Sequence, residues 1–271
     1  MTGLCHTLAE QIKNRLSGFT PDIALILGSG LGHIAECIEN PVIVKYADIE
    51  GFPQSSVRGH QGQFVAGILS GKKVLCMQGR IHLYEGHAPQ IIREIIHAFK
   101  LIGITKLFVT NAAGALNPEL TPGTIMLICD HINLSFANPL IGANDDTLGP
   151  RFPDMSNAYD KNLRNLALHT AAEYDIPLKQ GVYLMVSGPN FETAAEVRAF
   201  GILGGDAVGM STVPEVIAAN HAGLAVLGFS VITNFGTGLQ RQSQSHTETL
   251  AAAGRAADKL SQLLIHIFER L

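Results

Sequence analysis

Paired cysteines, basic blocks and long apolar runs are all missing from this chain of 271 residues. Its four cysteines, Cys5, Cys37, Cys76 and Cys129, lie far apart without a CxxC pair, which argues against a zinc site and against a disulfide framework. The formal net charge of −4 provides no positive field for nucleic acid. We therefore expect no metal, no nucleic-acid partner and a reducing, cytoplasmic location.

The longest apolar stretch, Ala222 to Thr233, is too short to cross a bilayer. The N-terminal segment MTGLCHTLAEQIKNRL carries acidic and basic residues at helical spacing instead of the apolar centre of a signal peptide. We expect no membrane partner and no export. Because 46% of the residues are hydrophobic and no repeat or linker interrupts them, we predict a single domain over residues 1–271.

Strand-like and helical patterns alternate along the chain, which is typical of an α/β fold with a mixed central β-sheet flanked by helices. The expected strands lie near residues 22–28, 42–47, 63–69, 72–78, 105–110, 123–129, 181–186 and 223–233. The expected helices lie near residues 4–16, 89–102, 159–174, 193–203, 213–222 and 246–269. Residues 135–160 show no convincing period. Long loops inside compact domains are usually functional, so we expect a lid or a subunit-contact loop there.

The stretch LILGSGLG, residues 25–32, ends an apolar run in three glycines. A glycine turn between a strand and a helix can hold a dinucleotide pyrophosphate or a single phosphate ion, and it can also serve only a tight turn. The third glycine comes one residue too early for the dinucleotide fingerprint, yet Asp48 stands about twenty residues beyond Gly28, where a ribose-binding acid would lie. These residues leave both ligands open, although the Ser29 hydroxyl slightly favours phosphate.

A second polar group follows the strand VLCM in the stretch QGRIHLYEGH, residues 78–87. In an extended chain, Arg80, His82 and Tyr84 share a face. The planar fork of arginine matches phosphate oxygens, histidine adds a donor, and tyrosine can both stack and hydrogen bond. An anion site is one interpretation, and a solvated edge strand is the other. The stretch NAAGAL, residues 111–116, ends the next strand and on its own predicts a structural turn.

Serine or threonine followed three residues later by glutamate marks three helix starts as capping boxes. Thr193 and Glu196 form one of them, which leaves Glu192 outside the first turn, either free to bind a ligand or simply an exposed loop acid. Thr212 and Glu215 form another.

The second capping box places Ser211 at a helix N-terminus, where the dipole and the unpaired amides favour an anion. The third, SHTE at residues 245–248, places His246 on the first turn of the last helix. Taken alone, His246 is an ordinary surface histidine.

In this order, the motifs resemble those of the trimeric class of purine nucleoside phosphorylases over nearly the whole chain. The motifs are ILGSGLG, GFPQSSVRGHQG, GRIHLYEG, VTNAAGALNP, CDHINL, RFPDMSNAYD, GPNFETAAEVR, GMSTVPEV and FSVITNFG. The resemblance sets the dinucleotide interpretation aside. It implies a homotrimeric enzyme of purine salvage, in which phosphate attacks C1′ of a 6-oxopurine ribonucleoside or deoxyribonucleoside and releases the base and a sugar 1-phosphate. Phosphate is then a co-substrate, and no cofactor is expected.

The resemblance also implies a role for each matching position. The phosphate-binding residues are Ser29, His60, Arg80, His82, Ser211 and the backbone of Ala112. The ribose-binding residues are Tyr84, Met210, His246 near the 5′ hydroxyl, and Phe152 from a neighbouring subunit. The base-binding residues are Phe191, Glu192 facing N1, and Asn234 facing N7 and the 6-oxygen. His82, Glu192 and Asn234 are the expected catalytic residues.

Two positions bear on which purines are accepted. Asn234 is followed by Phe235, Gly236, Thr237 and Gly238, a stretch in which mammalian-like members carry a lysine. Ser187 stands where relatives that also take xanthosine can differ. The preference among inosine, guanosine and xanthosine is therefore left open. The alternative within this fold, a methylthioadenosine phosphorylase, would place an aspartate at position 234 and a smaller apolar residue near His246, so both residues argue against it.

Overall fold

The computed structural model describes residues 3–55, 61–239 and 246–271, with only the backbone described for residues 246–253. Within them lies a nine-stranded sheet in the order β2-β3-β4-β1-β5-β8-β7-β6-β9, with an additional pairing of β5 and β9. The strands are β1 (Ile23–Ile26), β2 (Glu39–Lys45), β3 (Gln63–Leu69), β4 (Lys72–Gln78), β5 (Lys106–Ala115), β6 (Ile125–Asn133), β7 (Leu178–Met185), β8 (Ala207–Gly209) and β9 (Ala225–Phe235). The α-helices are α1 (Leu4–Arg15), α2 (Pro89–Leu101), α3 (Lys161–Glu173), α4 (Ala194–Ile202), α5 (Val213–His221) and α6 (His246–Arg270).

The sheet is mixed, as the sequence predicts. β1 runs parallel to β4 and β5, and β5 runs parallel to β9, so these four strands end at one edge. β2 and β3 form an antiparallel extension on one side. On the other side, the pairing of β5 with both β8 and β9 closes β5, β8, β7, β6 and β9 into a ring. The predicted α/β fold with a mixed sheet and flanking helices is confirmed.

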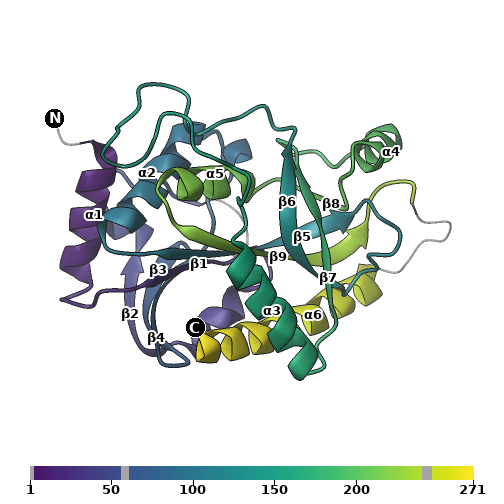
Figure 1. Cartoon of the computed structure of the whole chain (residues 1–271), viewed down its shortest axis with the longest axis horizontal. Helices are drawn as coiled ribbons and strands as arrows, with labels where there is room; N and C mark the ends of the chain where they lie inside the picture. Colours follow the sequence, from purple (N-terminus) through teal and green to yellow (C-terminus); the bar gives the residue numbers. More distant parts are fainter. Residues whose placement is uncertain (1–2, 56–60, 240–245) are drawn as a thin grey trace.

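Helices cover both faces of the sheet (Figure 1). α1, α2 and α5 pack on one face, and α3 and α6 pack on the other. Strand β1 is buried along its whole length. Ala24 and Ile26 belong to the hydrophobic core under α1, α2 and α5, and Ile23 and Leu25 belong to the core under α3 and α6. Because successive side chains point to opposite faces, a strand covered on both sides is a continuous apolar run rather than an alternating one.

Three local predictions are wrong. β8 was not predicted, because a strand of three residues is too short to show a period. NAAGAL is not a turn: β5 continues to Ala115 because β9 pairs with it along its whole length. Asp48 lies in a 3-10 helix, Tyr46–Asp48, exposed to solvent, where its carbonyl oxygen accepts a hydrogen bond from Arg15. Asp48 also follows β2, which β3 and β4 separate from β1, whereas the ribose-binding acid of a dinucleotide site follows a strand adjacent to the first.

Residues 135–160 contain no helix or strand, as expected from their lack of a period. No helix in the described part of the chain is both long enough and apolar enough to cross a membrane.

A directional chain of hydrogen bonds fastens this long loop to α5 and α2. Asn144 donates from Nδ2 to the Gly149 carbonyl at 2.9 Å, which leaves its Oδ1 to accept from His221 Nε2 at 3.0 Å. His221 Nδ1 then accepts from His97 Nε2 at 2.9 Å, and the two rings stack. Burial and the facing His221 lower the pKa of His97 to about 4, against the opposing effect of Glu94.

The pKa of His97 predicts a loss of stability in mild acid. Its folded-state value of about 4 lies below the ordinary value of 6.5, so between these values the unfolded chain binds more protons. Stability from neutral His97 is complete above pH 6.5 and falls as the pH drops toward 4, by about 2 kcal/mol between pH 7.5 and pH 5. Chemical denaturation at the two pH values measures this difference.

His97→Gln keeps a neutral donor toward His221 without a titrating group, so it should reduce the difference in stability between the two pH values. His169→Gln, an exposed histidine on α3, is the matched control and should leave that difference unchanged. If His97→Gln and wild type lose the same stability in acid, the proposed origin of the pH dependence is wrong.

Candidate functional site

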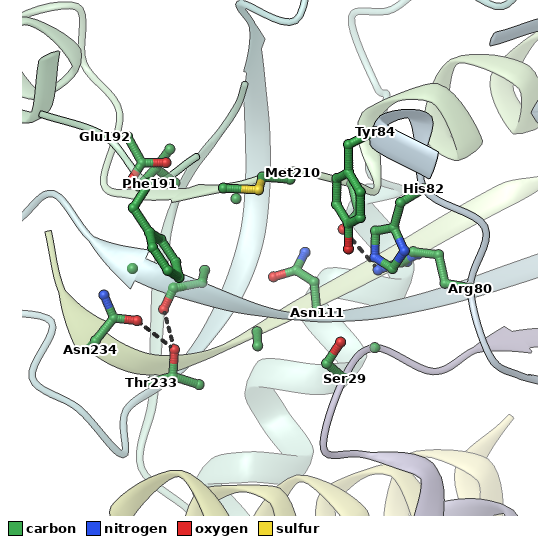
Figure 2. A pocket seen from close by; sticks show the side chains of 17 residues that line it. Ser29, Arg80, His82, Tyr84, Asn111, Phe191, Glu192, Met210, Thr233 and Asn234 are labelled. Atoms are coloured by element: carbon green, nitrogen blue, oxygen red, sulfur yellow. Dashed lines mark hydrogen bonds between the residues drawn. The ribbon is translucent and has the colours of Figure 1, made fainter. Parts of the chain in front are cut away.

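A cavity of about 330 Å³ lies where the parallel strands end. It is lined by Gly28, Ser29, Arg80, His82, Tyr84, Asn111, Ala112, Ala113, Gly114, Phe191, Glu192, Val208, Gly209, Met210, Ser211, Thr233 and Asn234. The carboxyl ends of parallel strands are the usual ligand-binding edge of α/β sheets. Figure 2 shows Ser29, Arg80 and His82 toward one end of the cavity, with Phe191, Glu192 and Asn234 toward the other.

The glycine turn after β1 is explained first by packing between strands. A Cβ on Gly28 would lie 2.6 Å from Asn111 Cα and 2.7 Å from the Thr110 carbonyl oxygen, so β5 itself excludes a side chain there. The Gly28 amide donates to Thr110 Oγ1 at 3.0 Å. Gly30 has a φ of +79°, a conformation that favours glycine. Together these contacts bring Ser29 to the edge of the cavity.

Arg80 forms the buried centre of one end of the cavity. Its side chain is 1% exposed, and its Nε lies 2.8 Å from Glu215 Oε1 on α5. Nη1 donates to the Thr110 carbonyl oxygen at 2.8 Å and to Ser211 Oγ at 3.0 Å. These contacts come from β5, α5 and the residues before α5, and they fix the plane of the guanidinium.

His82 lies beside Arg80, but not on the extended chain that the sequence predicts. Residues Leu83–Glu85 form a 3-10 turn, and the Glu85 carboxylate accepts from the His82 backbone amide at 2.8 Å. The same carboxylate lies 3.4 Å from His82 Nδ1. The His82 ring stacks on Tyr84 with centroids 4.7 Å apart. Arg80, His82 and Tyr84 therefore line one cavity through a turn rather than through strand alternation.

The predicted capping box of Thr212 and Glu215 is wrong. Thr212 has a φ of +79° and makes no side-chain cap; its Oγ1 accepts from Asn111 Nδ2 at 2.9 Å. Glu215 turns inward to Arg80 instead of back to the helix start. Ser211 still precedes α5 and lines the cavity, as predicted.

The opposite end of the cavity is more open. The capping box of Thr193 and Glu196 forms as predicted, with Oγ1 accepting from the Glu196 amide and the Glu196 carboxylate accepting from the Thr193 amide. Glu192 is left outside the helix and lines the cavity, half-buried. Burial raises the pKa of Glu192, and Glu196 adds to the effect. Phe191 beside it is 77% exposed.

Asn234 reaches this end through an irregularity in β9. Ala113 pairs with Ile232, but Gly114 pairs with Asn234, so β9 has one extra residue at this point. As a result, the consecutive residues Thr233 and Asn234 both line the cavity. The exposed Asn234 side chain accepts at Oδ1 from Thr233 Oγ1 at 2.8 Å (Figure 2). Its Nδ2 donates to the Phe235 carbonyl at 2.9 Å.

Comparison with known proteins gives the family. A family model described as the phosphorylase superfamily matches residues 22–269. Purine nucleoside phosphorylase 1 of Bacillus subtilis is 53% identical over 85% of this chain and 85% of its own length, and the Bos taurus enzyme is 48% identical over 90% and 87%. The chain belongs to the purine nucleoside phosphorylase family. A Schistosoma purine nucleoside phosphorylase crystallised with hypoxanthine has a TM-score of 0.91 and 39% identity, over 98% of this chain and 96% of its own.

Most of the residues that the family resemblance singles out lie in the cavity. They are Ser29, Arg80, His82, Tyr84, Ala112, Phe191, Glu192, Met210, Ser211 and Asn234. Phe152 lies apart, 88% exposed, beside a second cavity of about 360 Å³ that includes His131 and Arg151. His60, Ser245 and the side chain of His246 lie outside the described residues, as does the third predicted capping box.

The supporting contacts around the buried end of the cavity were not identified from the sequence. Glu215 contacts Arg80 instead of capping its helix, Asn111 donates to Thr212, and Glu85 accepts from the His82 amide. The pattern H-x-x-E at positions 82–85 is a signal that could have identified Glu85, because it has the spacing of a capping box. Ser187 lines a third cavity of about 340 Å³, on the other side of Glu192. Among the described residues, no group of three or more histidine, cysteine, aspartate or glutamate side chains is placed to hold a metal ion.

The family resemblance implies that Arg80 binds phosphate. On that hypothesis, Arg80→Ala should weaken the binding of inorganic phosphate about ten- to a hundredfold, because a hydrogen bond to a charged group contributes roughly 1.5 to 3 kcal/mol. Equilibrium dialysis with labelled phosphate measures the affinity, and thermal melting confirms folding. Arg80→Lys keeps the charge without the planar fork and should give a smaller loss. Arg93→Ala, which breaks an arginine–glutamate pair outside the cavity, is the control. A folded Arg80→Ala protein with wild-type affinity would contradict the assignment.

Proposed function

We propose that this chain cleaves purine ribonucleosides and deoxyribonucleosides with inorganic phosphate, giving the free base and ribose or deoxyribose 1-phosphate. The observation that carries the proposal is the division of one cavity into two chemically different ends. One end holds the buried cation Arg80 with His82 and Ser211, and the other holds Glu192 and Asn234. Phosphate fits the first end and a purine the second, so the C1′ carbon lies between nucleophile and leaving group.

Each end stabilises a different charge of the transition state. Cleavage of the glycosidic bond leaves negative charge on the purine and positive charge on the sugar. At the buried end, Arg80, His82, Ser29 and Ser211 orient phosphate so that its negative charge faces the developing cation. At the open end, an Asn234 hydrogen bond to N7 stabilises the departing base. Interactions that strengthen as these charges develop raise the rate of the chemical step.

The base end is suited to 6-oxopurines, with inosine and guanosine as the main substrates. Both carry a hydrogen on N1, which ionised Glu192 accepts, whereas adenosine presents a lone pair to the same carboxylate. An amide at position 234 can donate to the 6-oxygen as well as to N7. Xanthosine is a further candidate, because Ser187 and Glu192 both line the third cavity.

We also propose a homotrimer in which Phe152 of one subunit covers the ribose in the next. An aromatic side chain left 88% exposed and outside the main cavity of its own chain is free to pack against another copy. Phosphate is proposed as the sole co-substrate, because the phosphate anion and the cavity side chains together stabilise the positive charge on the sugar and the negative charge on the departing base. A cytoplasmic location is proposed because Cys5, Cys37, Cys76 and Cys129 are free thiols.

Wild-type protein should convert inosine to hypoxanthine only when phosphate is present, and adenosine should be a very poor substrate. A site whose polar groups pair with a substrate hydrogen rejects analogues without it by about 10⁴. Asn234→Asp puts an acceptor opposite a 6-amino group, so it should raise adenosine turnover relative to inosine and lower inosine turnover. Steady-state kcat/KM for each nucleoside, with methylthioadenosine for comparison, measures the preference.

Asn165→Asp, an exposed position on α3, makes the same chemical change away from the cavity and should leave the ratio unchanged. Comparable kcat/KM for adenosine and inosine in the wild type would show that Glu192 and Asn234 do not select the base in this way.

Shared sites between subunits predict complementation. Arg80→Ala and Phe152→Ala proteins should each be weakly active. In mixed oligomers, a Phe152→Ala subunit keeps its own Arg80 and receives Phe152 when its neighbour is an Arg80→Ala subunit. Random co-assembly of equal amounts should therefore restore roughly a quarter of the sites. Assay of purified mixed oligomers, sized by sedimentation, measures the recovery. No recovery in mixed trimers, or full activity in dissociated wild-type monomers, would refute the shared site.

A further inference from the structure

Glu215 lies outside the cavity lining but touches one of its central residues. It is on the first turn of α5, almost completely buried, with Oε1 2.8 Å from Arg80 Nε. Arg80 is the largest fully buried side chain among the described residues. A buried carboxylate and a buried guanidinium are each costly to desolvate and are tolerated only as a pair.

The local structure of α5 departs from the usual helix start in order to make this contact. A T-x-x-E sequence can cap its own helix, as Thr193 and Glu196 do at α4. At α5 the threonine has a positive φ and bonds to Asn111, and the glutamate faces Arg80. Strain of this kind persists only where surrounding contacts enforce it, and it concentrates at functional sites.

We infer that Glu215 is a positioning residue for phosphate, acting through Arg80; the inference rests on the proposed phosphorolysis. Glu215 fixes Nε, while the Thr110 carbonyl and Ser211 Oγ fix Nη1. The guanidinium therefore has one orientation before phosphate arrives. The carboxylate also offsets the arginine charge, so the orientation of the donors, rather than an excess of positive charge, determines how phosphate is presented to C1′.

Glu215→Gln tests this, because glutamine keeps the size of the side chain but offers the guanidinium a neutral amide in place of a carboxylate, which weakens the contact that orients Arg80. We expect kcat/KM for phosphate to fall at least tenfold and the KM for inosine to change less than threefold, since the base end is untouched. A general loosening of the fold would raise both KM values. Glu94→Gln is the matched control: it removes a carboxylate that lies 2.8 Å from Arg93, outside the cavity, and should keep wild-type kinetics.

A double-mutant cycle separates positioning from structure. In the Arg80→Ala background, Glu215→Gln should change kcat/KM for phosphate less than twofold, because the residue through which Glu215 acts is gone. The double variant should also melt at a higher temperature than Arg80→Ala alone, which leaves a buried carboxylate unpaired. If Glu215→Gln does not fold, Glu215→Asp takes its place in the same cycle, with the same coupling expected.

The outcomes are distinguishable. Wild-type protein that does not cleave inosine with phosphate refutes the proposed function itself. An active wild type whose Glu215→Gln variant keeps kcat/KM for phosphate within twofold refutes the role of Glu215. So does a loss that is equally large with and without Arg80.

Discussion

The buried ion pair between Arg80 and Glu215 is the contact around which the main cavity is built. It joins the segment after β4 to the first turn of α5, and the same guanidinium also contacts Ser211 and the middle of β5. Thr212, three residues before Glu215, has a positive φ. A charged pair with so little exposure tolerates few other arrangements, which makes the buried end of the cavity a preformed structure.

The two ends of α5 connect this pair to the long loop of residues 135–160. The N-terminal end carries Glu215, and the C-terminal end carries His221, which is bonded to Asn144 of the loop and to His97 of α2. Gly149 of the loop packs so closely on the His221 carbonyl that a side chain would overlap it. The segment bearing Phe152 is therefore anchored to the helix that orients Arg80.

Periodicity predicted the sheet, the flanking helices and the edge at which strands end, because these depend on repeated burial over many residues. It failed where a contact between distant residues decides the outcome. Thr193 with Glu196 and Thr212 with Glu215 have the same local pattern, yet only the first forms a cap, since Arg80 competes for Glu215. NAAGAL was misread for the same reason, because β9 is its partner. The assignment of cavity residues to phosphate, ribose and base came from the family resemblance, which carries information that local pattern lacks.

The contrast in burial between the two ends of the cavity bears on how this site can evolve. Arg80 and Ser211 are buried, so a substitution at this end of the cavity disturbs the fold as well as the cavity. Phe191 is largely exposed, and Asn234 sits on an extra residue of β9 with its side chain outside the core. Mutations at the open end can therefore be sampled at small cost to stability. Descendants of such a protein can change what the open end accepts while they inherit the buried end unchanged.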